Sequence, residues 1–98
     1  MTDAPLNEKY TAILDLHKML EEKGIPHELR RLGSGWQICA PDVENFNKKG
    51  SLVAVEHDFS HGSSLNFIEV YSYDYEETRG FLAPQEALQH FIKWNERR

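Results

Sequence analysis

The spacing of apolar residues changes twice along the chain. From Leu6 to Leu20 apolar side chains recur every three or four residues and fall on one side of a helical wheel, which predicts an amphipathic helix. Gly24, followed by an isoleucine and a proline, is typical of the end of such a helix. The same spacing returns from Ala87 to Trp94, after Pro84 at a helix entry, and predicts a second helix.

Between these helices, short runs rich in β-branched and aromatic residues are separated by turn residues, which predicts strands. The four runs are His27 to Leu32, Trp36 to Ala40, Leu52 to Phe59 and Leu65 to Tyr73. A Gly-Ser-Gly connection at residues 33–35 favours a hairpin between the first two. We interpret residues 41–50 as an excursion loop and residues 74–80 as an acidic loop.

The third run alternates between two sets of side chains, which should face opposite sides of a sheet. The first set is Val53, Val55, His57 and Phe59, and the second is Leu52, Ala54, Glu56 and Asp58. Because the second set carries the charges, we expect the first set to face the core and the second to face water.

The connections between the runs are too short for parallel crossovers, so the sheet should be antiparallel. Each helix has one apolar stripe, and packing both stripes on one sheet face is the economical arrangement. The sequence therefore predicts a two-layer α+β fold with a helix, a four-stranded antiparallel meander and a second helix, both helices on one sheet face. At 98 residues, the chain 1–98 is expected to form a single domain.

The sheet face without helices should then expose apolar residues of the last run, together with Leu52. They are either Ile68 and Val70 or the alternate set Leu65, Phe67, Tyr71 and Tyr73. A contiguous exposed apolar surface of this kind usually marks a contact site.

Negative charge is concentrated in one segment. The net charge is −5, and from Gly50 to Thr78 there are six acidic residues and no lysine or arginine. Such a segment repels phosphate and attracts basic proteins, which disfavours direct nucleic-acid binding. A nucleic-acid surface would require the basic pairs Arg30-Arg31, Lys48-Lys49 and Arg97-Arg98 to converge.

No run of apolar residues is long enough for a membrane helix, and the first residues lack the pattern of a signal peptide. The chain has one cysteine, Cys39, which cannot form an internal disulfide. These features predict a cytoplasmic protein without a membrane partner. We expect the Cys39 thiol, inside a predicted strand, to be buried and inert.

Two imidazoles and a carboxylate lie within five residues at His57, Asp58 and His61. Four-residue spacing on a strand and turn does not force these groups together, and no third nitrogen or sulfur ligand lies at a telling distance. A metal-dependent or hydrolytic enzyme using this cluster is therefore the alternative hypothesis, and we expect no cofactor. His17 lies in the apolar stripe of the first helix and should be buried and hydrogen-bonded, whereas His27 and His90 are isolated in the sequence.

An aromatic and acidic run offers the chemistry of a protein-binding surface, because tyrosines bring large contact areas and carboxylates suit a basic partner. The candidate contact residues are Phe67, Glu69, Tyr71, Tyr73, Asp74, Tyr75, Glu76 and Glu77. The competing interpretation is that these tyrosines only cover a sheet face and that the carboxylates belong to a solvated loop. Dimerisation through the same surface would satisfy the same pattern.

Three segments carry a resemblance to a group of known proteins. They are Gly35-Trp36-Gln37-Ile38, the run GSLVAVEH from Gly50 to His57, and the run GFLAPQEA from Gly80 to Ala87. Across residues 35–91 the chain resembles small uncharacterised proteins of bacterial prophages and other mobile elements, although Ala83 stands where a helix-opening Thr-Pro would have threonine. The resemblance implies a compact accessory protein without assigned activity. Small phage proteins often act by binding host machinery, and an acidic one can imitate nucleic acid toward a DNA-binding enzyme.

Overall fold

The computed structural model describes residues 10–46, 48–57, 67–72 and 78–97. They form two α-helices, one short 3-10 helix and a five-stranded antiparallel sheet in the order β1-β2-β3-β4-β5. In chain order the elements are α1 (Ala12–Lys23), β1 (Glu28–Leu32), β2 (Gly35–Ala40), η1 (Val43–Asn45), β3 (Leu52–Glu56), β4 (Ile68–Tyr71), β5 (Arg79–Leu82) and α2 (Pro84–Glu96).

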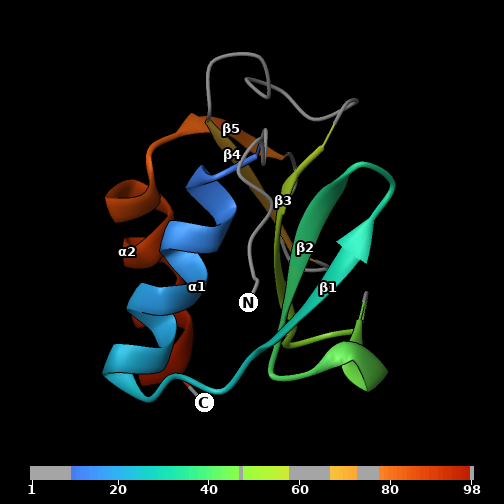
Figure 1. The fold of residues 1–98 in the computed structure, drawn as a ribbon. Helices are drawn as coiled ribbons and strands as arrows, with labels where there is room; N and C mark the ends of the chain where they lie inside the picture. Colours follow the sequence, from blue (N-terminus) through green and yellow to red (C-terminus); the bar gives the residue numbers. More distant parts are fainter. Residues whose placement is uncertain (1–9, 47, 58–66, 73–77, 98) are drawn as a thin grey trace.

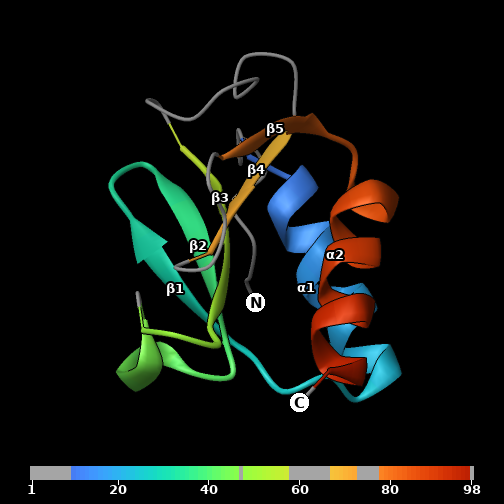
Figure 2. The same ribbon diagram turned by 180° about the vertical axis from the view of Figure 1, so that it is seen from behind.

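The two helices lie side by side on one face of the sheet, as Figures 1 and 2 show from opposite sides. α1 packs on β2 and β3, and α2 packs on β3, β4 and β5. The core between the layers contains side chains from both helices and from the strand positions that face them, among them Leu16, Leu20, Ile38, Ala54, Ile68, Val70 and Phe91, each with none of its surface exposed. The α+β class and the antiparallel sheet are thus confirmed.

The number of strands was predicted wrongly. Residues 79–82, which we assigned to an acidic loop and a helix entry, form β5 at the edge of the sheet. Among the described strands β5 pairs with β4 alone, and the register of this pair is irregular between Ile68 and Val70. A four-residue edge strand with Gly80 inside it has little local pattern, so its existence depends on the neighbouring strand rather than on its own sequence.

The local signals at the helix ends were informative. α1 ends at Gly24, which adopts a φ of 68°, and the N–H groups of Gly24 and Ile25 donate to the carbonyls of Glu21 and Leu20 at 3.1 Å. Ile25, 4 % exposed, packs into the core. α1 begins at Ala12, and the part of the predicted helix before Tyr10 lies outside the described residues.

The two faces of β3 are the reverse of the prediction. Leu52 and Ala54 belong to the core beneath the helices, with Glu56 on the same side, whereas Val53 and Val55 point to the other face. Glu56 is completely buried, and its carboxylate accepts a hydrogen bond of 3.0 Å from the backbone N–H of Ile13. The first turn of a helix has unpaired N–H donors and a partial positive charge, so a carboxylate is a suitable acceptor there. This long-range contact gives the buried carboxylate a hydrogen-bond donor on the helix side of β3.

The β1-β2 hairpin has a two-residue turn, since Leu32 pairs with Gly35. Gly35 lies where β2 passes close to the end of β3, and a Cβ atom at this position would stand 1.9 Å from the carbonyl oxygen of Glu56. Only glycine fits so near an opposing backbone. The glycine thereby allows the close approach of β2 to the end of β3, next to the site described below.

Candidate functional site

The sheet face away from the helices, here called the second face, carries the alternate residues of β1 to β4. From the strand register these are Glu28, Arg30, Gln37, Cys39, Val53, Val55, Glu69 and Tyr71. The central four, Gln37, Cys39, Val53 and Val55, are at most 2 % exposed. The placement of Leu52, Ile68 and Val70 on an open face is therefore wrong, because all three lie under the helices. Of the alternate set, Tyr71 lies on the second face and is partly exposed, but the apolar centre of that face is closed.

A chain of side-chain hydrogen bonds crosses the second face. Arg30 Nε donates to Gln37 Oε1 at 2.6 Å, and Gln37 Nε2 donates to the Tyr71 hydroxyl at 3.1 Å. Gln37 is on β2 and Tyr71 is on β4, so their bond spans β3 between them. Gln37 pairs with Val55 and Tyr71 with Val53 in the strand register, so the two polar side chains meet over these valines. The chain of bonds ties three strands together through one buried amide.

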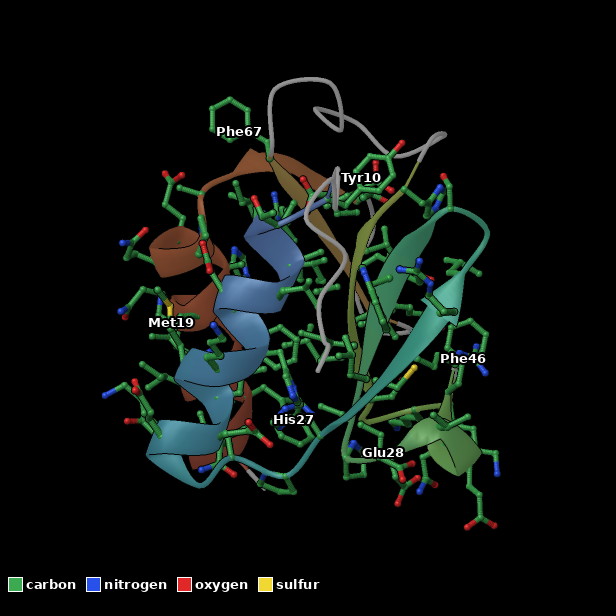
Figure 3. The ribbon with its side chains drawn as sticks, viewed as in Figure 1. Tyr10, Met19, His27, Glu28, Phe46 and Phe67 are labelled. Atoms are coloured by element: carbon green, nitrogen blue, oxygen red, sulfur yellow. The ribbon has the colours of Figure 1, made fainter. Side chains whose placement is uncertain are left out.

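The arginine end of this chain is held by the loop after β2. The Arg30 guanidinium lies 5.1 Å from the centre of the Phe46 ring, a cation–π contact. Glu28 Oε1 accepts a hydrogen bond of 2.7 Å from the Val43 N–H at the start of η1, and Asp42 caps the same turn by accepting from the Asn45 N–H at 3.0 Å. Figure 3 shows Phe46 beside β1, on the side away from the helices. The loop therefore restricts the position of Arg30.

The tyrosine end is partly buried and ready to donate a hydrogen bond. Burial raises the pKa of Tyr71; Cys39 and Glu69 add to the rise, while the hydrogen bond from Gln37 and the charge of Arg30 oppose it. The phenol therefore stays protonated at neutral pH. Because the Tyr71 oxygen accepts from Gln37, the hydroxyl proton can be donated to an acceptor that is not part of this series of hydrogen bonds.

Cys39 lies beside Gln37 on the second face. Its side chain is fully buried, and its thiol donates to Gln37 Oε1 at 3.5 Å. Burial raises the pKa of the thiol; nearby Arg30 lowers it, and Glu28 and Asp42 raise it further. A protonated, buried thiol is unreactive, in keeping with the sequence interpretation.

Three of the candidate contact residues fall within the described part of the chain. Glu69 and Tyr71 lie on the second face, and both are partly exposed. Phe67 directly precedes β4, and Figure 3 shows its ring projecting outward at the end of the sheet. The remaining candidates, Tyr73, Asp74, Tyr75, Glu76 and Glu77, lie outside the described residues.

The cluster predicted as an alternative metal or hydrolytic site is only partly described. His57 follows β3 in a bend and is partly buried, while Asp58 and His61 lie outside the described residues. Within the described ranges, no three or more histidine, cysteine, aspartate or glutamate side chains are placed to hold a metal ion. The convergence of His57, Asp58 and His61 stays a prediction.

The sequence interpretation missed one pair of residues. His27, which we considered isolated, lies against His17 on α1: His17 Nδ1 and His27 Nε2 are 2.8 Å apart, and the rings meet edge to face at 71°. His27 Nδ1 is also 2.8 Å from the Ile25 carbonyl oxygen, and His17 Nε2 is 3.5 Å from Glu21 Oε1. The signal was present in the sequence, because the helix end at Gly24 reverses the chain between the two histidines.

Arg30 and Arg31, the first of the basic pairs, lie on opposite faces of β1. The side chains of Arg30 and Arg31 alternate on β1, and the Arg31 guanidinium lies 4.1 Å from the Trp36 ring on the helix side. Trp94 Nε1 donates to the Gly50 carbonyl at 2.8 Å, which brings the end of α2 to the loop that carries Lys48 and Lys49.

No protein-family model, curated protein or solved structure matches this chain. In the described residues, neither helix combines the length and apolar composition that a bilayer crossing needs.

Proposed function

We propose that this chain is a small non-enzymatic protein-binding domain that contacts its partner through the second face at β4, around Tyr71 and Glu69. The observation that carries the proposal is the partly exposed Tyr71, whose hydroxyl is held by the Arg30-Gln37 chain of hydrogen bonds. The partner is a basic protein or a second copy of the chain, met in the cytoplasm, and direct binding of nucleic acid is not part of the proposal.

Fixing Tyr71 before binding favours association. An exposed side chain loses conformational freedom when it enters an interface, and prior ordering reduces that cost. Tyrosine also combines a large apolar ring with a polar tip, and is over-represented among the residues that dominate binding energy. Here the ring covers β3, while the hydroxyl proton is available to a partner's acceptor.

Charge defines the chemistry of the partner. Glu69 lies on the same face of β4 as Tyr71, two residues away, and both are in a segment of the chain with acidic residues and no lysine or arginine. The negative electrostatic potential of such a segment speeds encounters with a basic surface and disfavours encounters with an acidic surface. The resemblance to small prophage proteins, which bind host machinery, points to the same kind of role.

The test compares the wild-type protein with Tyr71→Ala, Glu69→Lys and the matched control Gln89→Ala on the exposed side of α2. Each protein is immobilised and used to capture partners from a cell lysate. Captured proteins that bind the wild type and the control but not the two second-face variants are purified, and their affinities are measured by calorimetry. We expect Tyr71→Ala to weaken binding by more than about 1 kcal/mol, at least fivefold in Kd. Light scattering across protein concentrations reports whether the partner is a second copy.

Circular dichroism establishes that each variant is folded before binding is compared. If folded Tyr71→Ala and Glu69→Lys bind every captured protein as tightly as the control does, and self-associate like the wild type, the second face is not the contact surface.

A further inference from the structure

The contacts of His17 and His27 determine where their hydrogens lie. The Ile25 carbonyl can only accept, so His27 Nδ1 carries a hydrogen and donates it. In neutral His27 the other nitrogen, Nε2, is then an acceptor. His17 Nδ1, 2.8 Å away, must be the donor in that contact. The neutral pair is thus a directed chain from His17 through His27 to the backbone.

This arrangement accepts one added proton and resists a second. The first can bind to His17 Nε2, which faces Glu21 Oε1 at 3.5 Å, without disturbing the bond to His27. A second proton would have to bind to His27 Nε2, the atom that accepts from His17. Two N–H groups would then oppose each other at hydrogen-bonding distance, between two positive rings.

The pair lies where α1 passes into β1. His27 directly precedes β1, and Figure 3 shows it beside the end of α1 nearest the chain reversal. The reversal itself is held by the Gly24 and Ile25 N–H bonds to α1 and by the buried Ile25 side chain. The bond between His17 and His27 adds a side-chain link between α1 and the residue that precedes β1.

We propose that His17 and His27 form a proton-controlled latch on the corner between α1 and β1. The hydrogen bond between the two rings is kept when the pair is neutral or carries one added proton, and it breaks when both rings are protonated. The charges that act on His17 are Glu21 on its own helix and His27 from the corner. From β3, Glu56 is bound to Ile13 at the opposite end of α1. On α2, His90 has its own basic neighbours, Arg79 and Lys93.

The dependence of stability on pH follows from the same contacts. Burial lowers the pKa of His17 below its usual 6.5; Glu21 opposes this effect and His27 adds to it. The unfolded chain therefore binds the proton more readily, so His17 contributes its full stability above about pH 6.5 and loses it as the pH falls below that value. The pKa of His90 is also lowered, by burial, Arg79 and Lys93, and its contribution has the same sign.

The experiment is a titration from pH 8 to pH 4 of protein with ¹⁵N-labelled histidine, read by NMR. We expect both His17 and His27 to carry Nδ1–H at pH 8, and the pair to take up protons in two separate steps. The amide signals of Gly24 and Ile25 should be unchanged in the first step and lose exchange protection in the second. The equilibrium constant of unfolding should rise about tenfold for each unit by which the pH is lowered, for each extra proton bound by the unfolded chain.

His17→Gln is the decisive variant, since its amide can still donate to His27 but takes no proton; it should abolish the two-step uptake. His27→Phe, which lacks the acceptor, serves if His17→Gln does not fold. His90→Gln is the control and should leave both steps in place while removing only its own share of the pH dependence. If His17 and His27 titrate independently, or if the corner amides stay protected with both rings charged, the latch does not exist.

Discussion

The two faces of the sheet are held by different physical means. On the helix side, buried apolar side chains from the two helices and from β2, β3 and β4 form one cluster. On the second face, Gln37 is equally buried, but it is fixed by directed bonds to Arg30 and Tyr71. Apolar packing depends on area and is tolerant of direction, whereas hydrogen bonds require defined geometry.

The difference matters for function. An apolar cluster stabilises the fold without selecting the orientation of any one group. A directed chain of bonds sets the position of its last member, here the hydroxyl of the partly exposed Tyr71, through the buried amide of Gln37. The helix side therefore stabilises the fold, and the second face fixes the position of the partly exposed Tyr71 side chain.

Removing a large side chain from the helix side should have the greatest effect. Phe91 is fully buried on α2 between the helices and the sheet. We expect Phe91→Ala to lower the free energy of unfolding by about 3–5 kcal/mol, because it leaves a cavity in a packed core. Urea denaturation followed by tryptophan fluorescence measures this loss, with Gln89→Ala as the exposed control. A loss below about 1 kcal/mol would show that the cluster is not the main source of stability.

An intermediate effect is expected at the centre of the second face. Gln37→Ala leaves Arg30 Nε and the Tyr71 hydroxyl without their present partner. Losing buried hydrogen bonds should lower the free energy of unfolding by about 1–3 kcal/mol. The same urea experiment provides the value, and NMR signals of the Tyr71 ring should broaden or shift. An unchanged Tyr71 environment would contradict the role given to Gln37.

The smallest effect belongs to the exposed end of the chain of bonds. Tyr71→Phe keeps the ring and removes only the hydroxyl that accepts from Gln37. We expect a loss of about 0.5–1.5 kcal/mol, the range of a single hydrogen bond. Combining this variant with Gln37→Ala in a double-mutant cycle should give a total smaller than the sum of the two losses. Full additivity would mean that the two side chains do not act together.

Local rules predicted the end of α1 and the start of α2, but the helix predicted from Leu6 included Tyr10 and Thr11, which precede the observed start of α1 at Ala12. The end of α1 at Gly24 follows from a glycine and an apolar residue in sequence order. α2 begins at Pro84, and Glu86 accepts from the Ala83 N–H at 2.9 Å, as a carboxylate in the first turn should. Each of these features depends on residues within one turn of each other, which is why the sequence alone reveals them.

Long-range contacts account for the failures. The alternation along β3 placed the charged set in water, but the carboxylate of Glu56 is buried and accepts from Ile13 at the start of α1, forty-three residues away in the sequence. β5 exists because β4 offers it a partner, and the His17-His27 pair forms because the chain reverses between them. For the site, the sequence selected Glu69 and Tyr71, but not Gln37 and Arg30, whose roles arise from the packing of neighbouring strands.

Cys39 makes the natural protein its own reporter. Its sulfur is shielded completely and has a neutral, protonated form at physiological pH, so a disulfide reagent reaches it only when strands part. The rate of thiol labelling therefore measures how often the sheet opens locally around Gln37. The measurement needs no attached probe and no substitution. That rate can be followed in the same sample while pH or a partner is varied.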